Sequence, residues 1–263
     1  MTYIFAHRGA SKYTPENTMA SFQKALELKA DGIELDVQLS KDKIPVVIHD
    51  ETLKRTTNGK GFVSEHSYNE LRRLDAGSWY SHQYKEEKIS SLEEILIWLK
   101  PTHLQLNIEF KNTVLPYYNM ERLVYDLVMK YDLKKRAIYS SFNHYSLREL
   151  QRIDRGNEVA PLYSSGLYEP WNYVRKLNTK SAHPHWRTVN TNILKNFAKH
   201  GIKIRSYTIN DPKKMQWFFD QHVEAIITDV PDIARSVLEG VHQPTPSKLM
   251  TVFQKLNPLK SYK

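Results

Sequence analysis

The 263-residue sequence contains no cysteine. Without thiols the chain has neither a disulfide framework nor a thiolate metal site, which excludes structural zinc fingers and cysteine nucleophiles. It also lacks an apolar run that approaches the roughly 20 residues of a membrane-spanning helix. The first ten residues, MTYIFAHRGA, lack the basic and long apolar regions of a signal peptide. We therefore expect a soluble, cytoplasmic protein.

Acidic residues are outnumbered by basic ones. The 29 Asp and Glu residues stand against 38 Lys and Arg residues, which gives a net charge of +9 at pH 7. This charge favours anionic partners such as phosphate esters, anionic lipid or nucleic acid, although a solvated lysine-rich surface explains it equally well. The sequence has no nucleic-acid-binding motif and no stripe of basic and aromatic residues. We therefore expect no nucleic-acid partner.

Eight short β-type segments alternate with amphipathic helical segments. The expected strands span residues 3–6, 32–38, 105–110, 137–140, 158–162, 181–183, 202–207 and 225–228. The expected helices span residues 17–29, 118–130, 146–154, 191–200, 212–221 and 232–239. Such alternation predicts a parallel sheet with right-handed crossovers. Eight units favour a closed α/β barrel of the TIM type, (β/α)8, over an open doubly wound sheet.

Local signals mark several of the expected helix ends. Three segments combine a capping residue with a proline and so predict helix starts: Thr14-Pro15-Glu16-Asn17, Asn210-Asp211-Pro212 and Asp229-Val230-Pro231-Asp232. Gly201 follows the expected helix 191–200, where a left-handed residue is expected.

Two stretches fall outside the regular alternation. Residues from about 50 to 100 lie between the second and third barrel strands and are too many for an ordinary connection. We interpret them as an insertion on the rim of a single catalytic barrel domain, residues 1–242. A basic tail, residues 243–263, places Leu249, Phe253 and Leu256 on one helical face. That helix would dock on the barrel or, alternatively, make a peripheral membrane contact.

Two acidic residues, Glu34 and Asp36, stand two positions apart in the expected strand 32–38. Alternate residues of a strand point to the same face, so both carboxylates project together, away from Ile33 and Leu35. Paired carboxylates on a buried strand repel each other and are poorly solvated, and a divalent cation relieves both problems. Arginine or lysine partners are the structural alternative. The end of a barrel strand, where active sites gather, favours a metal site.

The next expected strand carries a second polar face. Asn107, Glu109 and Lys111 point to the same side by the same period-two rule. Glu109 is the candidate third metal ligand and Lys111 a candidate phosphate contact, whereas a simple Glu–Lys pair is the structural alternative. Oxygen-only ligands suit one Ca²⁺ or Mg²⁺ ion better than zinc or copper.

Two of the 11 histidines, His7 and His49, stand at the ends of extended segments. Hydrolysis of an ester bond needs a base for the nucleophile and an acid for the leaving group, and histidine exchanges protons near neutral pH. Their positions beside Arg8 and Asp50 distinguish them from an ordinary structural histidine. Arg8 is suited to grip phosphate oxygens bidentately, and an ion pair with Glu16 is the structural alternative.

Six segments together resemble the glycerophosphodiester phosphodiesterase family, whose superfamily also holds phosphatidylinositol-specific phospholipase C. They are His7-Arg8-Gly9, Pro15-Glu16-Asn17-Thr18, GIELDV (residues 32–37), VVIHD (46–50), NIEFK (107–111) and IITDVPD (226–232). Each is weak alone. They run in the family's order and cover nearly the whole chain up to about Gly240, so the combination is highly specific.

The resemblance implies metal-dependent hydrolysis of glycerophosphodiesters to sn-glycerol 3-phosphate and an alcohol. The residues that it implies are the metal ligands Glu34, Asp36 and Glu109, the acid–base pair His7 and His49, and the substrate contacts Arg8, Lys111 and Tyr207. In the mechanism commonly proposed for the family, a glycerol hydroxyl attacks phosphorus. A cyclic phosphate forms as the alcohol leaves, and water then opens the ring.

Two positions depart from the family pattern. Tyr207 stands where members usually carry Trp, which keeps an aromatic wall but adds a hydroxyl, and the turn at residues 42–45 lacks an expected glycine. One alternative function is a lysophospholipase D, whose apolar groove would use the insertion residues Phe62, Trp79, Tyr80 and Tyr84. The other is a non-catalytic barrel that binds phosphate or lipid. Retention of all five acidic and histidine residues argues against the second.

Overall fold

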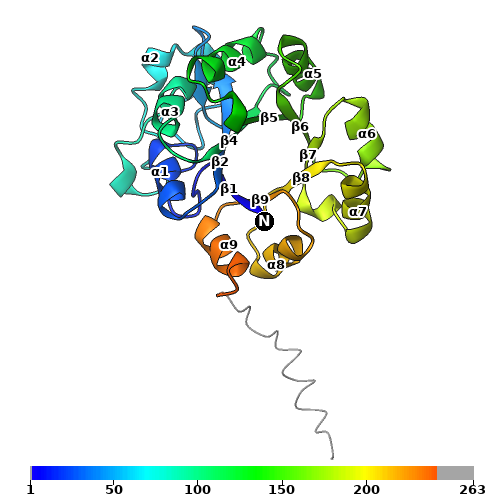
Figure 1. Ribbon diagram of the computed structural model, residues 1–263. Coiled ribbons are helices and arrows are strands. Elements are labelled where there is room, and N and C mark those ends of the chain that lie inside the picture. Colours follow the sequence, from blue (N-terminus) through cyan, green and yellow to red (C-terminus); the bar gives the residue numbers. More distant parts are fainter. Residues whose placement is uncertain (1, 242–263) are drawn as a thin grey trace, which may run out of the picture.

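The fold is a closed barrel of parallel strands, described here by a computed structural model for residues 2–241 (Figure 1). Within these residues the barrel strands are β1 (Tyr3–His7), β2 (Gly32–Leu39), β4 (Gln105–Phe110), β5 (Ala137–Ser141), β6 (Glu158–Tyr163), β7 (Ser181–Pro184), β8 (Lys203–Ser206) and β9 (Ala225–Thr228). Strand β1 pairs in parallel with both β2 and β9, which closes the ring. The predicted TIM-type barrel is confirmed, and each of the eight expected strands is present.

Helices surround the barrel and cover its outer face (Figure 1). They are α1 (Met19–Glu27), α3 (Leu92–Leu99), α4 (Met120–Lys130), α5 (His144–Ile153), α6 (Pro170–Lys176), α7 (Thr191–Lys199), α8 (Pro212–Asp220) and α9 (Pro231–Leu238). The sequence did not predict α3 and α6. Four buried residues of α3 pack in the same apolar cluster as Leu106 and Ile108 of β4. This helix therefore belongs to the outer layer of the barrel, although it lies within residues 50–100.

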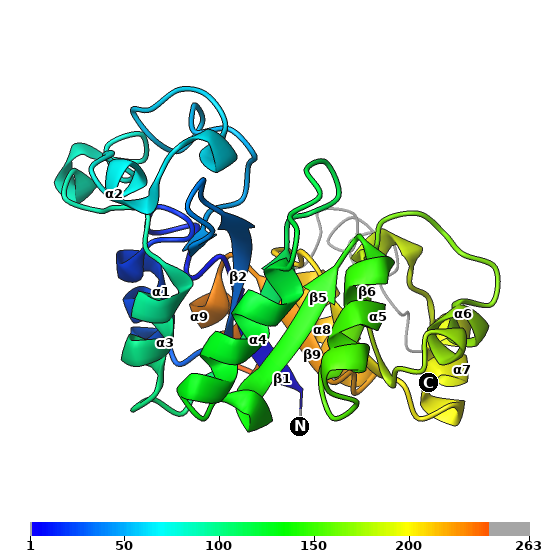
Figure 2. The ribbon, with the colours of Figure 1, turned by 90° about the horizontal axis from the view of Figure 1, so that it is seen from above.

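The segment between β2 and α3 begins with β3 (Pro45–Val47), which pairs antiparallel with β2. The remainder contains the short helix α2 (Tyr68–Leu71) and stands above one side of the barrel (Figure 2). Its own apolar cluster includes Leu53, Val63 and Leu71. The hydroxyl of Tyr80 donates to the carbonyl of Lys12 at 2.6 Å, which ties the segment to the loop after β1.

Three aromatic residues of this segment, Trp79, Tyr80 and Tyr84, pack against one another. Trp79 and Tyr80 meet edge to face, as do Tyr80 and Tyr84. The indole N–H of Trp79 donates to the carbonyl of Ala76, and the hydroxyl of Tyr84 donates to the carbonyl of Tyr13. These contacts give the aromatic residues a packing role. They offer no observation in favour of an apolar groove for an acyl chain.

Helix caps follow the expected chemistry at some positions only. Asp211 is the N-cap of α8 and accepts from the N–H of Lys214, as predicted. The prediction for α1 was wrong by one turn, because Thr18 rather than Thr14 caps it. Asp229 does not cap α9; its N-cap is Val230, and Asp229 turns toward the barrel. Gly201 adopts φ +63°, the predicted left-handed conformation.

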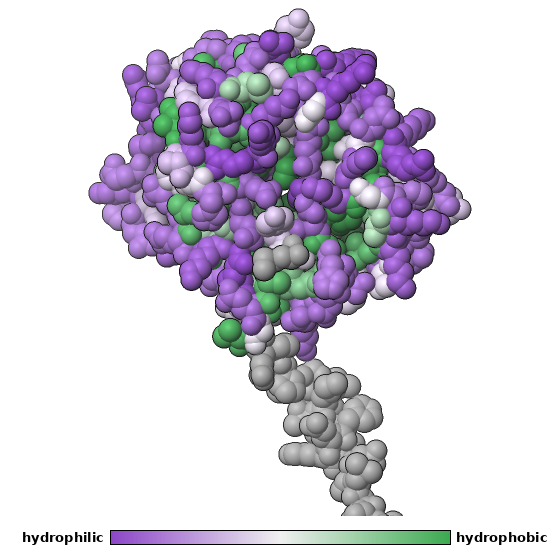
Figure 3. All heavy atoms as spheres, in the orientation of Figure 1, coloured by the Kyte–Doolittle hydropathy of each residue, from purple (hydrophilic) through white to green (hydrophobic). Residues whose placement is uncertain are grey.

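Apolar residues fill the space between strands and helices, and β2 is buried along its whole length. Inside the barrel, Phe5, Ile138, Ala160 and Ile227 form a smaller cluster with the ring of Tyr207. The face in Figure 3 is mainly hydrophilic. No helix among residues 2–241 is long and apolar enough to cross a membrane. The basic tail at residues 243–263, with its expected helix, lies outside the described residues.

Gly9 lies in the loop between β1 and α1, two residues after the end of β1. It adopts φ +82°, and a Cβ there would lie 2.6 Å from the backbone carbonyl carbon of Ser21. Gly201 also has a positive φ, but a Cβ there meets no atom within 4 Å. We expect Gly201→Ala to cost only the ~1–2 kcal/mol of a left-handed non-glycine residue. Gly9→Ala should cost clearly more, because the first turn of α1 must also shift.

The measurement is urea unfolding of both variants and the wild type. The two substitutions add the same methyl group at a left-handed position, so their difference isolates the steric contact. Equal losses of unfolding free energy would show that Ser21 moves aside without cost and would contradict this account.

Candidate active site

Three carboxylates meet at the C-terminal end of the barrel. In the register of β2 and β4, Asp36 is paired with Glu109 and Glu34 with Asn107. The three acids Glu34, Asp36 and Glu109 offer carboxylate oxygens that all lie within 4.8 Å of one another. Glu34 and Asp36 are almost completely buried, at 3% and 1% exposure. The structure therefore brings together the residues that the sequence singled out as metal ligands.

Positive and polar groups of the chain surround these carboxylates. Arg8 Nε lies 3.2 Å from Asp36 Oδ2, and Lys111 Nζ lies 2.8 Å from Glu109 Oε1. The side chain of Asn17 donates to Asp36 Oδ2 at 2.8 Å. The backbone N–H of Arg8 donates to Glu34 Oε2 at 2.9 Å. Asp36 Oδ1 is buried without a hydrogen-bond partner among the described residues, so one oxygen of the cluster has unused acceptor capacity.

Burial and mutual repulsion shift the pKa values of the three acids apart. Burial, reinforced by the charge of Asp36, raises the pKa of Glu34 to about 8. Burial and the same charge also raise the pKa of Glu109. Burial alone would raise the pKa of Asp36, but the charges of Arg8 and Lys111 outweigh it and lower that pKa to about 2. Full ionisation of the cluster thus calls for further positive charge, which a divalent cation would supply.

His7 is held by a carboxylate from the other end of the chain. Its Nδ1 lies 2.7 Å from Asp229 Oδ1, and the hydroxyl of Ser11 donates to the same oxygen at 3.0 Å. Burial by itself lowers the pKa of His7, but the hydrogen bond to Asp229 and the charge of Glu34 outweigh it, so the net pKa is raised. Asp229 engages Nδ1, so Nε2 is the ring nitrogen that this contact leaves open.

His49 is held in the same way by its neighbour in the chain. Its Nδ1 lies 2.6 Å from Asp50 Oδ1. Its Nε2 lies 3.1 Å from Lys111 Nζ, which also contacts Glu109. Both predicted acid–base residues thus present Nε2 at the same end of the barrel as the acidic cluster, each with a carboxylate on Nδ1.

Arg8 and Tyr207 complete the predicted set. Arg8 makes the alternative ion pair with Glu16, at 2.8 Å, in addition to its contact with Asp36. The hydroxyl of Tyr207 donates to the carbonyl of Tyr163 at 3.2 Å. The ring of Tyr207 meets the ring of Phe142 edge to face, and Lys111 Nζ lies 6.0 Å from the centre of that Phe142 ring. Tyr207 is therefore one member of an aromatic pair whose other member, Phe142, lies near Lys111.

Sequence reasoning missed the groups that orient these residues. Asp50 and Asp229 stood inside the motifs, but Asp229 was interpreted as a helix cap. Asn17 was assigned to a helix start, and its side chain instead bonds to Asp36. Arg55 lies in a polar loop with no periodic signal, and it contacts both Asp50 and Glu16.

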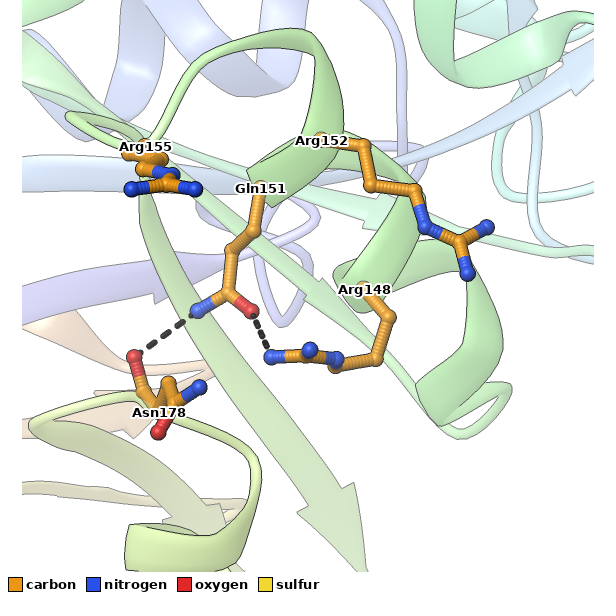
Figure 4. A pocket seen from close by; sticks show the side chains of 5 residues that line it. All are labelled: Arg148, Gln151, Arg152, Arg155 and Asn178. Atoms are coloured by element: carbon orange, nitrogen blue, oxygen red, sulfur yellow. Dashed lines mark hydrogen bonds between the residues drawn. The ribbon is translucent and has the colours of Figure 1, made fainter.

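A separate hollow between the C-terminal ends of α5 and α6 is lined by three arginines with Gln151 and Asn178 (Figure 4). Arg148 donates to the side chain of Gln151 and to the carbonyl of Leu177 at the end of α6. Gln151 in turn donates to the carbonyl of Asn178. These bonds go to carbonyls that follow the last residue of α6, and they tie α5 to the end of α6. None of the predicted site residues lines this hollow.

Comparison with known proteins places the chain among phosphodiesterases. The model of the glycerophosphoryl diester phosphodiesterase family matches residues 7–233. A glycerophosphodiester phosphodiesterase of Caldanaerobacter subterraneus subsp. tengcongensis is 39% identical over 231 residues, which cover 88% of this chain and 95% of that protein. The chain belongs to the glycerophosphoryl diester phosphodiesterase family.

Solved structures with the same fold include two phosphodiesterases. One, from Oleispira antarctica, is in complex with the product sn-glycerol-3-phosphate. It has a TM-score of 0.83 and 29% identity, covering 91% of this chain and 97% of that one. The other, a glycerophosphodiester phosphodiesterase from Agrobacterium tumefaciens, has a TM-score of 0.79 and 30% identity, covering 90% of this chain and 100% of that one.

The raised pKa of Glu34 predicts a pH-dependent stability in chelator-treated protein. The unfolded chain releases this proton near pH 4.3, whereas the folded chain holds it up to about pH 8. Between these values the folded form binds more protons, so stability falls as the pH rises. Glu34→Gln removes this group and keeps an oxygen that accepts from the N–H of Arg8. We expect the variant to lose less stability than the wild type between about pH 5 and about pH 8.

The measurement is urea unfolding with EDTA across that pH range. Glu86→Gln is the matched control, because Glu86 is exposed. A Glu34→Gln variant whose stability falls with pH as steeply as that of the wild type would contradict the prediction.

Proposed function

We propose that this protein hydrolyses glycerophosphodiesters to sn-glycerol 3-phosphate and an alcohol, with one divalent cation and with His7 and His49 as the acid–base pair. The observation that carries the proposal is the meeting of three carboxylates and two carboxylate-bound histidines at one end of the barrel. Family membership and the product bound in the Oleispira antarctica structure support the substrate class.

Glu34, Asp36 and Glu109 would hold the cation, and Asp36 Oδ1, which is buried and accepts no hydrogen bond from the described residues, fits that role. Oxygen ligands alone favour Ca²⁺ or Mg²⁺. The bound cation would stabilise negative charge on the phosphoryl oxygens and orient a glycerol hydroxyl. Arg8 and Lys111 lie against the same carboxylates and would bind the phosphate, Arg8 through its planar guanidinium and Lys111 as a compact charge. The ring of Tyr207 would form a wall of the pocket.

Two proton transfers are needed in each half of the reaction. One histidine takes the proton of the attacking glycerol hydroxyl, and the other gives a proton to the leaving alcohol oxygen as the cyclic phosphate forms. The roles reverse when water opens the ring, which restores both histidines to their starting states. Asp229 and Asp50 hold the Nδ1 side of each ring, so Nε2 is the atom that exchanges the proton.

The direct test is release of sn-glycerol 3-phosphate from glycerophosphocholine by the purified protein. We expect release to stop with EDTA and to return with Ca²⁺ or Mg²⁺, because the acidic cluster needs positive charge to be fully ionised. Calorimetric titration with the same cation should show binding that Glu109→Ala weakens. Release that continues with EDTA would contradict the metal dependence. No release with any cation would contradict the glycerophosphodiester substrate.

Each histidine should act in both halves of the reaction. We therefore expect His7→Ala and His49→Ala each to lower kcat by more than the ~10²–10⁴-fold that is usual for one acid–base group. Steady-state kinetics measures the loss, and circular dichroism checks the fold. His103→Ala is the control, because His103 is exposed. A loss below about tenfold, far under that range, would remove the residue from the proposed mechanism.

A further inference from the structure

Arg55 lies in the segment between β3 and α3 and makes four side-chain hydrogen bonds. Its Nε and Nη2 donate to the two oxygens of Asp50 at 2.7 and 2.9 Å. Its Nη1 and Nη2 donate to the two oxygens of Glu16 at 2.8 Å each. One planar guanidinium thus joins two carboxylates that lie 5 and 39 positions away in the sequence.

Both carboxylates are shared with predicted site residues. Asp50 Oδ1 accepts from Arg55 and also contacts His49 Nδ1. Glu16 Oε1 accepts from Arg55 and also from Arg8 Nη1. An unbroken chain of contacts therefore runs from the imidazole of His49 through Arg55 to the guanidinium of Arg8.

The backbone around Arg55 is fixed by other contacts. Leu53 is completely buried, and its carbonyl accepts from the backbone N–H and the hydroxyl of Thr57. The backbone N–H of Asn58 donates to the carbonyl of Asp75, and the backbone N–H of Asp75 donates to the side-chain oxygen of Asn58. The loop therefore has anchors that do not involve the side chain of Arg55, and all four bonds of that side chain go to Asp50 and Glu16.

We propose that Arg55 is a positioning residue that fixes His49, through Asp50, and Arg8, through Glu16, around the substrate phosphate. The proposal rests on the proposed function. Arginine suits this place because its rigid fork makes two bidentate pairs at once, which the single ammonium of lysine does not. With its side chain 43% exposed, Arg55 lies at the surface of the site. It acts through its two partners and is not assigned a contact with substrate.

The kinetic test compares Arg55→Ala and Arg55→Lys with the wild type. Loss of a group that orients a functional residue typically costs about 10–100-fold, so we expect a fall of that size in kcat/KM for Arg55→Ala. Arg55→Lys should recover little, because it keeps the charge and loses the fork. Arg122→Ala is the control, since Arg122 makes an exposed ion pair with Asp126 on α4. Full activity of either Arg55 variant would overturn the proposal.

A double-mutant cycle tests the route through Asp50. If Arg55 acts partly by holding Asp50, Arg55→Ala should cost less activity in an Asp50→Ala background than in the wild type. If the fold-loss of the double variant equals the product of the fold-losses of the two single variants, the two residues act independently, and that route is overturned.

A measurement that does not depend on catalytic activity separates this proposal from the proposed function. The ring-nitrogen signals of His49, identified by their loss in His49→Asn, are recorded by NMR in histidine-labelled protein. We expect them to shift in folded Arg55→Ala and to stay unchanged in Arg122→Ala. Unchanged His49 signals in folded Arg55→Ala would overturn the positioning role even if the wild type is fully active. Shifted signals would support that role even if the wild type releases no glycerol 3-phosphate.

Discussion

Confinement of three carboxylates at one end of the barrel is the constraint on which the rest of the site depends. Two neighbouring parallel strands place Glu34, Asp36 and Glu109 on the same interior face. Buried like charges are costly unless positive groups compensate them. Arg8 and Lys111 supply part of that compensation. The same two cations are the proposed phosphate-binding groups. Arg8 and Lys111 would therefore both stabilise the buried carboxylates and bind the substrate phosphate.

The two histidines reach similar local arrangements by different routes. His7 and Asp229 are 222 positions apart and meet because β1 pairs with β9 where the barrel closes. His49 and Asp50 are adjacent, so closure of the barrel does not bring them together. The pair instead contacts the loop that carries Arg55, because Asp50 accepts from Arg55 Nε. One histidine of the proposed acid–base pair therefore contacts the barrel strands' own carboxyl end, and the other contacts the segment above the barrel.

Period-two patterns explain why much of the fold and the acidic cluster could be predicted. Alternation places Glu34 with Asp36 and Glu109 with Lys111, whatever the details of packing. The orienting residues carry no such signal. Asp229 stands in Asp-Val-Pro-Asp, whose composition is that of a helix start, and only strand closure reveals its contact with His7. Arg55 lies in an aperiodic loop, and Glu16 is its partner only through tertiary structure.

Tyr207 stands where the sequence resemblance leads us to expect a tryptophan, and its surroundings accommodate the hydroxyl. Its phenol ring brings a hydroxyl into a half-buried position, and an unpaired hydroxyl there would cost free energy. The carbonyl of Tyr163 accepts from that hydroxyl, so the ring alone is left to face Phe142 and His185. Since the polar atom is already satisfied within the protein, Tyr207 offers its surroundings an aromatic ring and no free hydroxyl.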